Sequence, residues 1–378
     1  MENILNKKRI KSEIFLFSNL WFLFYLLKIG ILPCGKTSND SYVILNIRLE
    51  RRTHFPLRKM VIYMKIAILE AATVSRGDVS FEEIYKLGEI REYPLTPLEK
   101  IIENIGGAEA VLCNKTPFTA EIMENCPNLR YIGLCATGFN NVDIKAASRL
   151  GITVCNVPAY SDFAVAQQVF AFILYFCNRI SDYDNFVRDG GWIRSATFSA
   201  FDFPTAELCG KTLGIIGYGR IGHAVSKIAV AFGMNVLVHT RTVRPDDGVS
   251  FASLDEVMEK SDFITLHCPL TPETNGLIDL SLLKKCKPSA ALINTSRGPV
   301  VNENDLRAAL DSGIIAFAGL DVLSEEPMRS DCPLIGCEKC VITPHVAWSP
   351  VETRIRLVKT VAENLRAYIN GNPINKVN

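Results

Sequence analysis

The sequence predicts an α/β protein with two doubly wound parallel-sheet domains and a cleft between them. The chain of 378 residues is too long for one ordinary domain. From Met64 onward, short apolar runs alternate with amphipathic stretches, which is the pattern of parallel strands joined by helices. With 48% hydrophobic and 21% charged residues, the composition is that of a globular protein.

Residues 1–63 precede this pattern, and we interpret them as an extension outside the fold. Lys7, Lys8, Arg9 and Lys11 come before an apolar segment at residues 14–33. Positive charges followed by an apolar segment are also typical of a membrane anchor or a cleaved signal sequence, which remain alternatives.

The first domain begins with the run at residues 66–69. Its predicted strands are residues 66–69, 110–113, 131–134 and 153–156, and the helical segments between them are residues 97–105, 119–125 and 144–150. A helix predicted at residues 164–180 is apolar on most faces, so we expect it to be buried between domains or subunits.

The second domain contains six predicted strands, enough for a complete doubly wound nucleotide-binding fold. These strands are residues 212–216, 236–239, 263–267, 290–294, 317–320 and 341–342. A last helix at residues 350–370 follows the completed sheet and is long enough to return to the first domain.

Charge and cysteine content exclude several classes of protein. Residues 1–63 carry eleven Lys/Arg and four Asp/Glu, so the net charge of +1 leaves −6 on the remainder, which argues against a nucleic-acid partner. The twelve cysteines are scattered through apolar segments, as expected for reduced thiols in a cytoplasmic protein. Cys332, Cys337 and Cys340 lack the fourth ligand of a structural zinc site, so no metal is predicted.

A glycine-rich turn lies at the start of the second domain. The run at residues 212–216 leads into a G-x-G-x-x-G turn formed by Gly217, Tyr218, Gly219, Arg220, Ile221 and Gly222, and a helix follows. In this context Gly217 permits a tight turn, Gly219 lets a pyrophosphate approach the backbone, and Gly222 lets the helix lie close to the strand. The amides at the helix N-terminus favour phosphate, so the turn indicates a dinucleotide site rather than a plain βα turn.

The next strand end bears on the choice of cofactor. NAD-binding proteins usually place an acid there to bind the ribose 2′-hydroxyl. Here Thr240 and Arg241 follow the strand, with Arg244 nearby. An arginine can pair with a 2′-phosphate, so NADP(H) is favoured over NAD(H), or at least tolerated, unless both arginines are only solvated.

Three polar residues follow late strands. Arg297, Glu326 and His345 each come after an apolar run, and ligands of open α/β sheets bind at the carboxyl ends of strands. Reduction of a 2-keto acid needs a cation for the carboxylate and the ketone, which Arg297 can supply. It also needs an acid–base group, which fits His345, and a carboxylate such as Glu326 would fix the histidine tautomer. Taken singly, each could instead be a surface ion-pair residue or part of a helix cap.

With these motifs in order, the sequence resembles the D-isomer-specific 2-hydroxyacid dehydrogenase family over residues 65–372. The matching segments are residues 217–222, 294–298, 320–327 and 343–348. Residues 154–161, 165–167, 207–211 and 344–348 are similar to the glycerate dehydrogenase/hydroxypyruvate reductase branch. Thr240 departs from the aspartate of many members, which puts strict NAD use in doubt.

The resemblance implies a flavodoxin-like substrate domain (residues 64–162 and 346–378), a Rossmann domain (residues 163–345) and a homodimer formed through the latter. It implies that Arg297, Glu326 and His345 are catalytic, and that Ala136, Thr137, Gly138 and Trp348 contact the substrate. The cofactor site predicted overall comprises Gly217, Gly219, Arg220, Ile221, Gly222, Thr240, Arg241, Pro269, Thr274, Thr295, Ser296 and Asp321.

The function expected from these features is interconversion of a small D-2-hydroxy acid and its 2-keto acid, with glycerate and hydroxypyruvate, or glyoxylate, as first candidates. A D-lactate type of enzyme and a non-catalytic nicotinamide sensor on the same fold are the alternatives. An exported enzyme would lack its nicotinamide pool, so we expect a cytoplasmic protein without a membrane partner.

Overall fold

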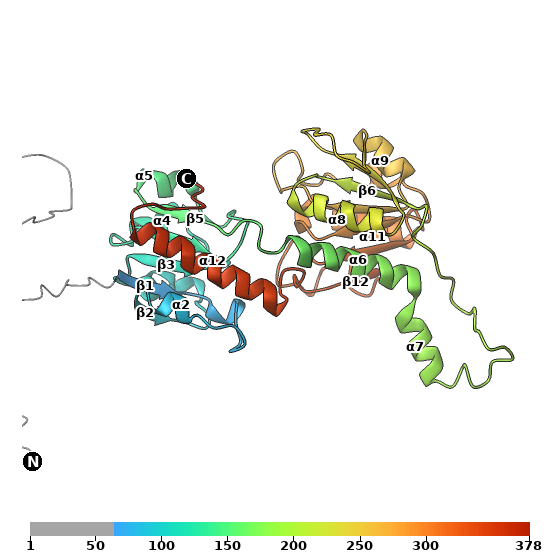
Figure 1. Ribbon diagram of the computed structural model, residues 1–378, viewed down its shortest axis with the longest axis horizontal. Coiled ribbons are helices and arrows are strands. Elements are labelled where there is room, and N and C mark those ends of the chain that lie inside the picture. The colour runs from blue at the N-terminus through green and yellow to red at the C-terminus, as the bar shows by residue number, and fades with distance from the viewer. Residues whose placement is uncertain (1–63) are drawn as a thin grey trace, which may run out of the picture. The chain divides into compact units, whose positions relative to one another are not determined.

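Two parallel β-sheets with helices between their strands make up residues 64–378, the part of the chain described by the computed structural model (Figure 1). The α/β class and the two-sheet fold predicted from the sequence are confirmed. The expectations for residues 1–63 lie outside the described residues.

The first sheet has five strands in the order β2-β1-β3-β4-β5. The strands are β1 (Met64–Ile68), β2 (Gly88–Glu92), β3 (Ala110–Cys113), β4 (Tyr131–Leu134) and β5 (Thr153–Cys155). Between them lie η1 (Ala71–Thr73), α2 (Glu82–Tyr85), η2 (Leu98–Lys100), α3 (Ile101–Ile105), α4 (Ala120–Glu124) and α5 (Ile144–Arg149). Strand β2 was not predicted, because its sequence GEIRE is a charged, partly exposed edge rather than an apolar run.

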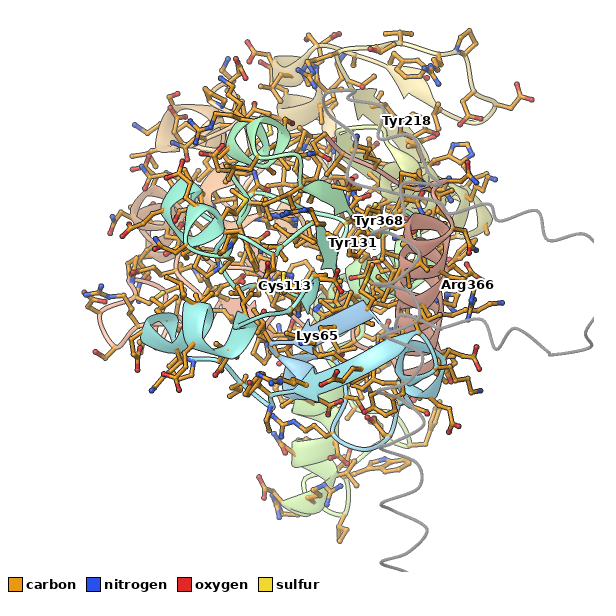
Figure 2. The ribbon with its side chains drawn as sticks, turned by 90° about the vertical axis from the view of Figure 1, so that its left-hand side faces the viewer. Lys65, Cys113, Tyr131, Tyr218, Arg366 and Tyr368 are labelled. Carbon is orange, nitrogen blue, oxygen red and sulfur yellow. The ribbon has the colours of Figure 1, made fainter. Side chains whose placement is uncertain are left out.

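The last helix, α12 (Val351–Ile369), packs on this first sheet. Leu357, Val361 and Leu365 share one hydrophobic cluster with residues of β1, β3 and β4. Near the helix end, the rings of Tyr368 and Tyr131 lie 4.7 Å apart, and Figure 2 shows them side by side. The predicted return of the C-terminal helix is therefore observed.

The second sheet has seven parallel strands in the order β12-β11-β10-β9-β6-β7-β8. They are β6 (Thr212–Ile216), β7 (Asn235–His239), β8 (Ser250–Phe251), β9 (Phe263–Leu266), β10 (Ala291–Asn294), β11 (Phe317–Leu320) and β12 (Cys340–Ile342). The helices are α8 (Arg220–Ala231), α9 (Leu254–Lys260), α10 (Leu280–Leu283), η3 (Gly298–Val300) and α11 (Glu303–Asp311). The sequence predicted six strands, since β8 is only two residues long and lacks an apolar pattern.

The strand order reverses between β6 and β9, where the chain crosses from one half of the second sheet to the other. In open α/β sheets, ligands bind at the carboxyl ends of the strands beside such a switch point. The glycine turn after β6 lies at this position.

One apolar helix, α6 (Asp162–Asn178), covers the second sheet. A side chain at Gly319 of β11 would collide with Phe172 of this helix, which shows how closely they pack. The predicted helix at residues 164–180 is broken at Arg179, which adopts φ 52°, and α7 (Ile180–Arg188) follows.

Among the described residues, no single helix has the length and hydropathy of a membrane span. Helices α6 and α7, which meet at a bend of 51°, reach those values together.

Candidate active site

The glycine turn has the shape that a dinucleotide requires. Gly217 has φ 94°, and a side chain there would come within 2.5 Å of the Cys268 amide nitrogen. A side chain at Gly222 would come within 2.5 Å of the Gly217 carbonyl oxygen, so α8 begins directly against the turn. By contrast, a side chain at Gly219 would meet no atom within 4 Å. The space in front of Gly219 and the start of α8 is therefore open to a phosphate group.

Two buried polar atoms lie at neighbouring strand ends. The Oγ1 atom of Thr295 after β10 and the Nδ1 atom of His267 after β9 have no hydrogen-bond partner among the described residues. Polar groups at this depth normally have partners, so the two atoms fit a site that receives a polar ligand. His267 was missed by the sequence analysis; its Nε2 lies 2.9 Å from Thr265 Oγ1, and burial lowers its pKa to about 3.

The other residues predicted to bind the cofactor lie either in loops that follow strands or at the start of α8. Thr240 and Arg241 follow β7, and Arg241 is exposed with Glu273 nearby. Thr274 accepts from the Thr271 amide and donates to the Pro269 carbonyl, so these residues shape their own loop. In contrast, the Arg220 side chain is paired with Asp162 at 2.7 Å, and Ile221 packs against the hydrophobic core. Either could reach a ligand through its backbone amide.

Arg297 is carried by a tightly packed loop after β10. Ser296 bonds to Asn294 Oδ1 through both its amide and its hydroxyl, and Asn294 donates to the Arg297 carbonyl. A side chain at Gly298 would overlap the backbone carbonyl of Leu323, so this loop lies directly against the one that carries Glu326. The loop geometry thus brings Arg297 and Glu326 into one region.

The loop at residues 136–138 approaches Arg297 from the first sheet. A side chain at Gly138 would overlap the Arg297 guanidinium. Thr137 donates to the Val157 carbonyl and accepts from Asn156 through its own carbonyl, which fixes the loop. Within residues 64–378, the amides of Ala136, Thr137 and Gly138 bind no acceptor of the chain. A cation and free amides therefore converge as a carboxylate would require.

His345 and Glu326 form a close pair. Nδ1 of His345 lies 2.7 Å from Oε2 of Glu326, and both side chains remain partly exposed. Burial raises the pKa of Glu326, but its bonds to His345 and to the Leu323 amide outweigh this effect, so the pKa is lowered overall. An ionised carboxylate can only accept, so Nδ1 is the donor, and Nε2 is left for a ligand.

Asp321 organises the segment that carries His345. Its buried carboxylate accepts from the Thr343 hydroxyl at 2.6 Å and from the Val346 and Ala347 amides, both at 2.9 Å. The His345 amide donates to the Asp321 carbonyl, and His345 adopts φ 53°. Burial raises the pKa of Asp321, and the three hydrogen bonds oppose that shift. Asp321, predicted as a cofactor-site residue, is thus already bonded to the loop that carries His345.

The aromatic candidates lie in two places. Trp348 is partly buried with its ring 6.4 Å from that of Tyr160, against the core of the first sheet. Phe198 and Phe201, which follow α7, are 90% and 89% exposed, so their rings do not line a described pocket.

Lys115 and Glu70 were missed by the sequence analysis. Oε2 of Glu70, after β1, accepts from three consecutive amides, those of Asn114, Lys115 and Thr116, at 2.8–2.9 Å. Burial lowers the pKa of Lys115; Glu326 opposes this shift, and Arg297 adds to it. Lys115 is therefore a second cation near the catalytic candidates, and its only sequence signal was its position after a strand.

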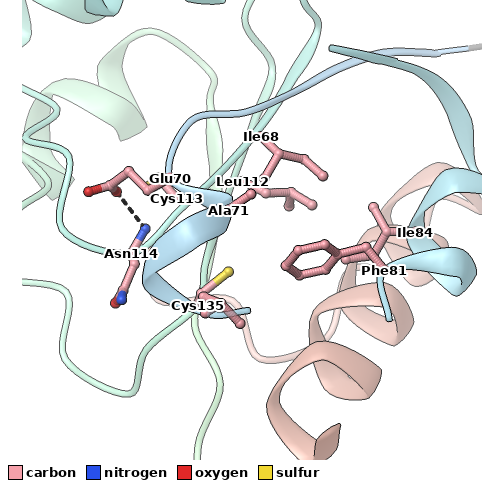
Figure 3. A pocket seen from close by; sticks show the side chains of 10 residues that line it. Ile68, Glu70, Ala71, Phe81, Ile84, Leu112, Cys113, Asn114 and Cys135 are labelled. Carbon is pink, nitrogen blue, oxygen red and sulfur yellow. Dashed lines mark hydrogen bonds between the residues drawn. The ribbon is translucent and has the colours of Figure 1, made fainter. Parts of the chain in front are cut away.

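A small apolar cavity lies beside this loop. Figure 3 shows Glu70 and Asn114 at its edge, joined by a hydrogen bond, with Phe81 and Cys135 also in the lining. At about 10 Å³ it has room for no more than a water molecule, so it is a packing defect rather than a substrate site.

The switch-point turn and the polar residues at the strand ends define a nicotinamide-dinucleotide oxidoreductase. Within the part of the chain that the structure describes, no group of three or more His, Cys, Asp or Glu side chains could hold a metal ion. Residues 170–347 match the NAD-binding domain of the D-isomer-specific 2-hydroxyacid dehydrogenases. Together with the relatives described next, this match places the chain in this family.

Relatives and solved structures support the same assignment. The chain is 42% identical over 321 residues to a hydroxypyruvate reductase of Blautia hydrogenotrophica, covering 83% of this chain and 100% of the relative. It is 40% identical over 303 residues to a glycerate dehydrogenase of Methylorubrum extorquens, covering 79% and 95%. An NADPH-dependent glyoxylate/hydroxypyruvate reductase from Sinorhizobium meliloti, in complex with NADP and malonate, superposes with a TM-score of 0.72 at 26% identity, covering 83% and 97%.

Proposed function

We propose that this enzyme reduces a short 2-keto acid, hydroxypyruvate or glyoxylate, to the D-2-hydroxy acid, with NADP(H) preferred over NAD(H). The observation that carries the proposal is the His345–Glu326 pair, whose atoms lie 2.7 Å apart in the region that also contains Arg297. The nicotinamide supplies or accepts a hydride when it is bound. The names of the hydroxypyruvate-, glycerate- and glyoxylate-specific relatives support the choice of substrate.

In this proposal the chain's own residues bind the substrate and move a proton. The guanidinium of Arg297 and the amides of residues 136–138 bind the carboxylate, while Arg297 also polarises the ketone. Nε2 of His345 delivers a proton to the carbonyl oxygen as it becomes an alkoxide. Glu326 holds the orientation and tautomer of the imidazole through its contact with Nδ1. In the oxidative direction, the same nitrogen takes the proton back.

The cofactor preference is proposed from the residues after β7. No acid occupies position 240, and the exposed Arg241 is available to a 2′-phosphate. The acid nearest along this segment, Asp246, is bonded to Tyr218 and His223. Its Oδ2 atom is therefore already engaged by two side chains of the protein.

In this proposal, residues 64–162 and 346–378 form the substrate domain, and residues 163–345 form the nucleotide domain. We place the protein in the cytoplasm, where the nicotinamide pool is available and its eleven free cysteines, among the residues described, would stay reduced.

A panel of 2-keto acids tests the proposal. Hydroxypyruvate, glyoxylate, pyruvate and longer acids are each assayed for loss of NADPH and NADH absorbance. The highest kcat/KM is expected with hydroxypyruvate or glyoxylate and NADPH. A preference for pyruvate would indicate a D-lactate type of enzyme, and no turnover with any acid would favour a nicotinamide sensor. A hundredfold preference for NADH would overturn the interpretation that residues 240–244 favour NADP(H).

A further inference from the structure

Four polar side chains form a cluster beside the glycine turn. The Tyr218 hydroxyl donates to Oδ2 of Asp246 at 2.6 Å and lies 2.9 Å from the Ser226 hydroxyl. Nδ1 of His223 lies 2.8 Å from the same carboxylate oxygen. The Tyr218 and His223 rings meet edge-on with centroids 5.7 Å apart. One oxygen of Asp246 thus joins residues that come from three segments.

The positions of these residues in the fold give the cluster a role. Tyr218 lies between Gly217 and Gly219 in the turn, and His223 and Ser226 are on α8. Asp246 belongs to the connection between β7 and β8, which begins at Thr240 and includes Arg241 and Arg244. The cluster therefore fastens the connection that carries both arginines to the turn that faces the phosphates.

The charge states at neutral pH favour the hydrogen bonds of the cluster. The hydrogen bond from Tyr218 lowers the pKa of Asp246; burial opposes this, and the charge of His223 adds to it. Burial, together with the bond to Asp246, raises the pKa of Tyr218 to about 12. At neutral pH the carboxylate is ionised and the phenol is protonated, so the donor and acceptor match. A hydrogen bond to a charged acceptor is stronger than one between neutral groups.

We propose that Tyr218, Asp246 and His223 are positioning residues that fix residues 240–249 for recognition of the 2′-phosphate of NADP(H). This inference rests on the proposed cofactor preference and assigns its structural cause. An arginine on a fastened connection loses less conformational freedom on binding than one on a loose connection, so affinity for the 2′-phosphate is gained without a direct contact from the cluster.

Binding of two nucleotides that differ only in the 2′-phosphate tests the inference. Calorimetric titration of Tyr218→Phe with 2′,5′-ADP should give a Kd raised about tenfold, the effect of one lost charge-assisted hydrogen bond, while the Kd for 5′-AMP stays unchanged. Asp246→Asn, which breaks the same hydrogen bond from the other side, should behave in the same way and guards against a Tyr218 variant that folds poorly. The matched control is Tyr85→Phe, which removes a tyrosine–carboxylate bond (to Glu92, 2.5 Å) on the first sheet and should change neither Kd.

The outcomes distinguish this inference from the proposed function, because the nucleotide-binding measurements do not require turnover of a 2-keto acid. An equal loss of affinity for both nucleotides would overturn it by showing a general structural role. Unchanged affinity for both would overturn it by showing that the cluster plays no part in binding. Wild-type protein that binds the two nucleotides equally would overturn it as well, together with the cofactor preference. Absence of turnover with every 2-keto acid, combined with the expected loss of 2′,5′-ADP affinity, would contradict the substrate proposal and support this one.

Discussion

In the proposed mechanism, single side chains at the ends of strands carry the chemistry. Glu326 is a clear case, because its carboxylate lies 2.7 Å from His345 Nδ1 and its pKa is lowered. The exposed neighbour Glu325 pairs with Arg329 instead. Two adjacent glutamates therefore offer a matched comparison.

Glu326→Gln should lower kcat about 10²-fold, toward the lower end of what general acid–base groups contribute. Without the carboxylate, the tautomer and orientation of the His345 ring are no longer fixed, so proton delivery from Nε2 should be slower. Glu325→Gln should retain the wild-type rate. An unchanged kcat in Glu326→Gln would remove Glu326 from the proposed role.

His267 makes a second prediction at this scale, on stability rather than rate. Its pKa of about 3 in the folded protein lies below that of an ordinary histidine, so the unfolded chain binds the additional proton between about pH 6.5 and 3. Stability should therefore be lost as pH falls through this window. In urea titrations, His267→Gln should show a shallower loss of stability from pH 7 to 4 than wild type. Equal slopes in the two proteins would show that His267 is not held neutral.

At the scale of elements, the glycines of the turn have different roles: some are needed for the backbone to fold and others for a ligand to bind. Gly217 is required by its φ of 94° and by the Cys268 backbone, whereas Gly219 is in open space. Its φ of −86° is also available to any residue.

Gly219→Ala should consequently fold with the wild-type Tm but bind NADPH at least tenfold more weakly, because the added methyl group occupies the space proposed for phosphate. Gly217→Ala should lower both Tm and affinity. Thermal melts with fluorescence titration of NADPH distinguish the two effects. Wild-type affinity in Gly219→Ala would mean that the dinucleotide does not approach this turn.

At the scale of the whole molecule, exposed apolar side chains after α6 point to self-association. Ile193, Phe198 and Phe201 are 88%, 90% and 89% exposed, and α7 buries no residue of its own. A monomer rarely leaves so many large apolar groups in water. We expect these residues to lie in the proposed homodimer interface.

Sedimentation should therefore give twice the 42.0 kDa mass of the chain. Replacing Phe198 and Phe201 together by serine should shift the protein toward monomer. Leu98→Ser, at an exposed apolar position 71% accessible near the first sheet, serves as the control and should stay dimeric. A wild-type monomer at micromolar concentration would contradict the expectation.

The strands at the core of both sheets could be predicted from the sequence, whereas several edge elements could not. Buried parallel strands such as β3 and β10 read as continuous apolar runs because both of their faces are covered. Strands β2 and β8 lack this signal, since an edge strand is held by its backbone hydrogen bonds and not by buried side chains. The exposed helix α7 likewise gave no sign of the break at Arg179.

By itself, the sequence determined the α/β class, the glycine turn and the identity of the strand-end residues, because these depend on local periodicity and on the lack of a side chain. Only the tertiary structure decided that Glu70 fixes the Lys115 loop, that Asp321 binds the His345 loop, and that Asp246 is paired with Tyr218. Each of these partners lies many residues away, and such contacts depend on the strand order of a sheet. A parallel sheet brings distant carboxyl ends together, and no local pattern records which ends become neighbours.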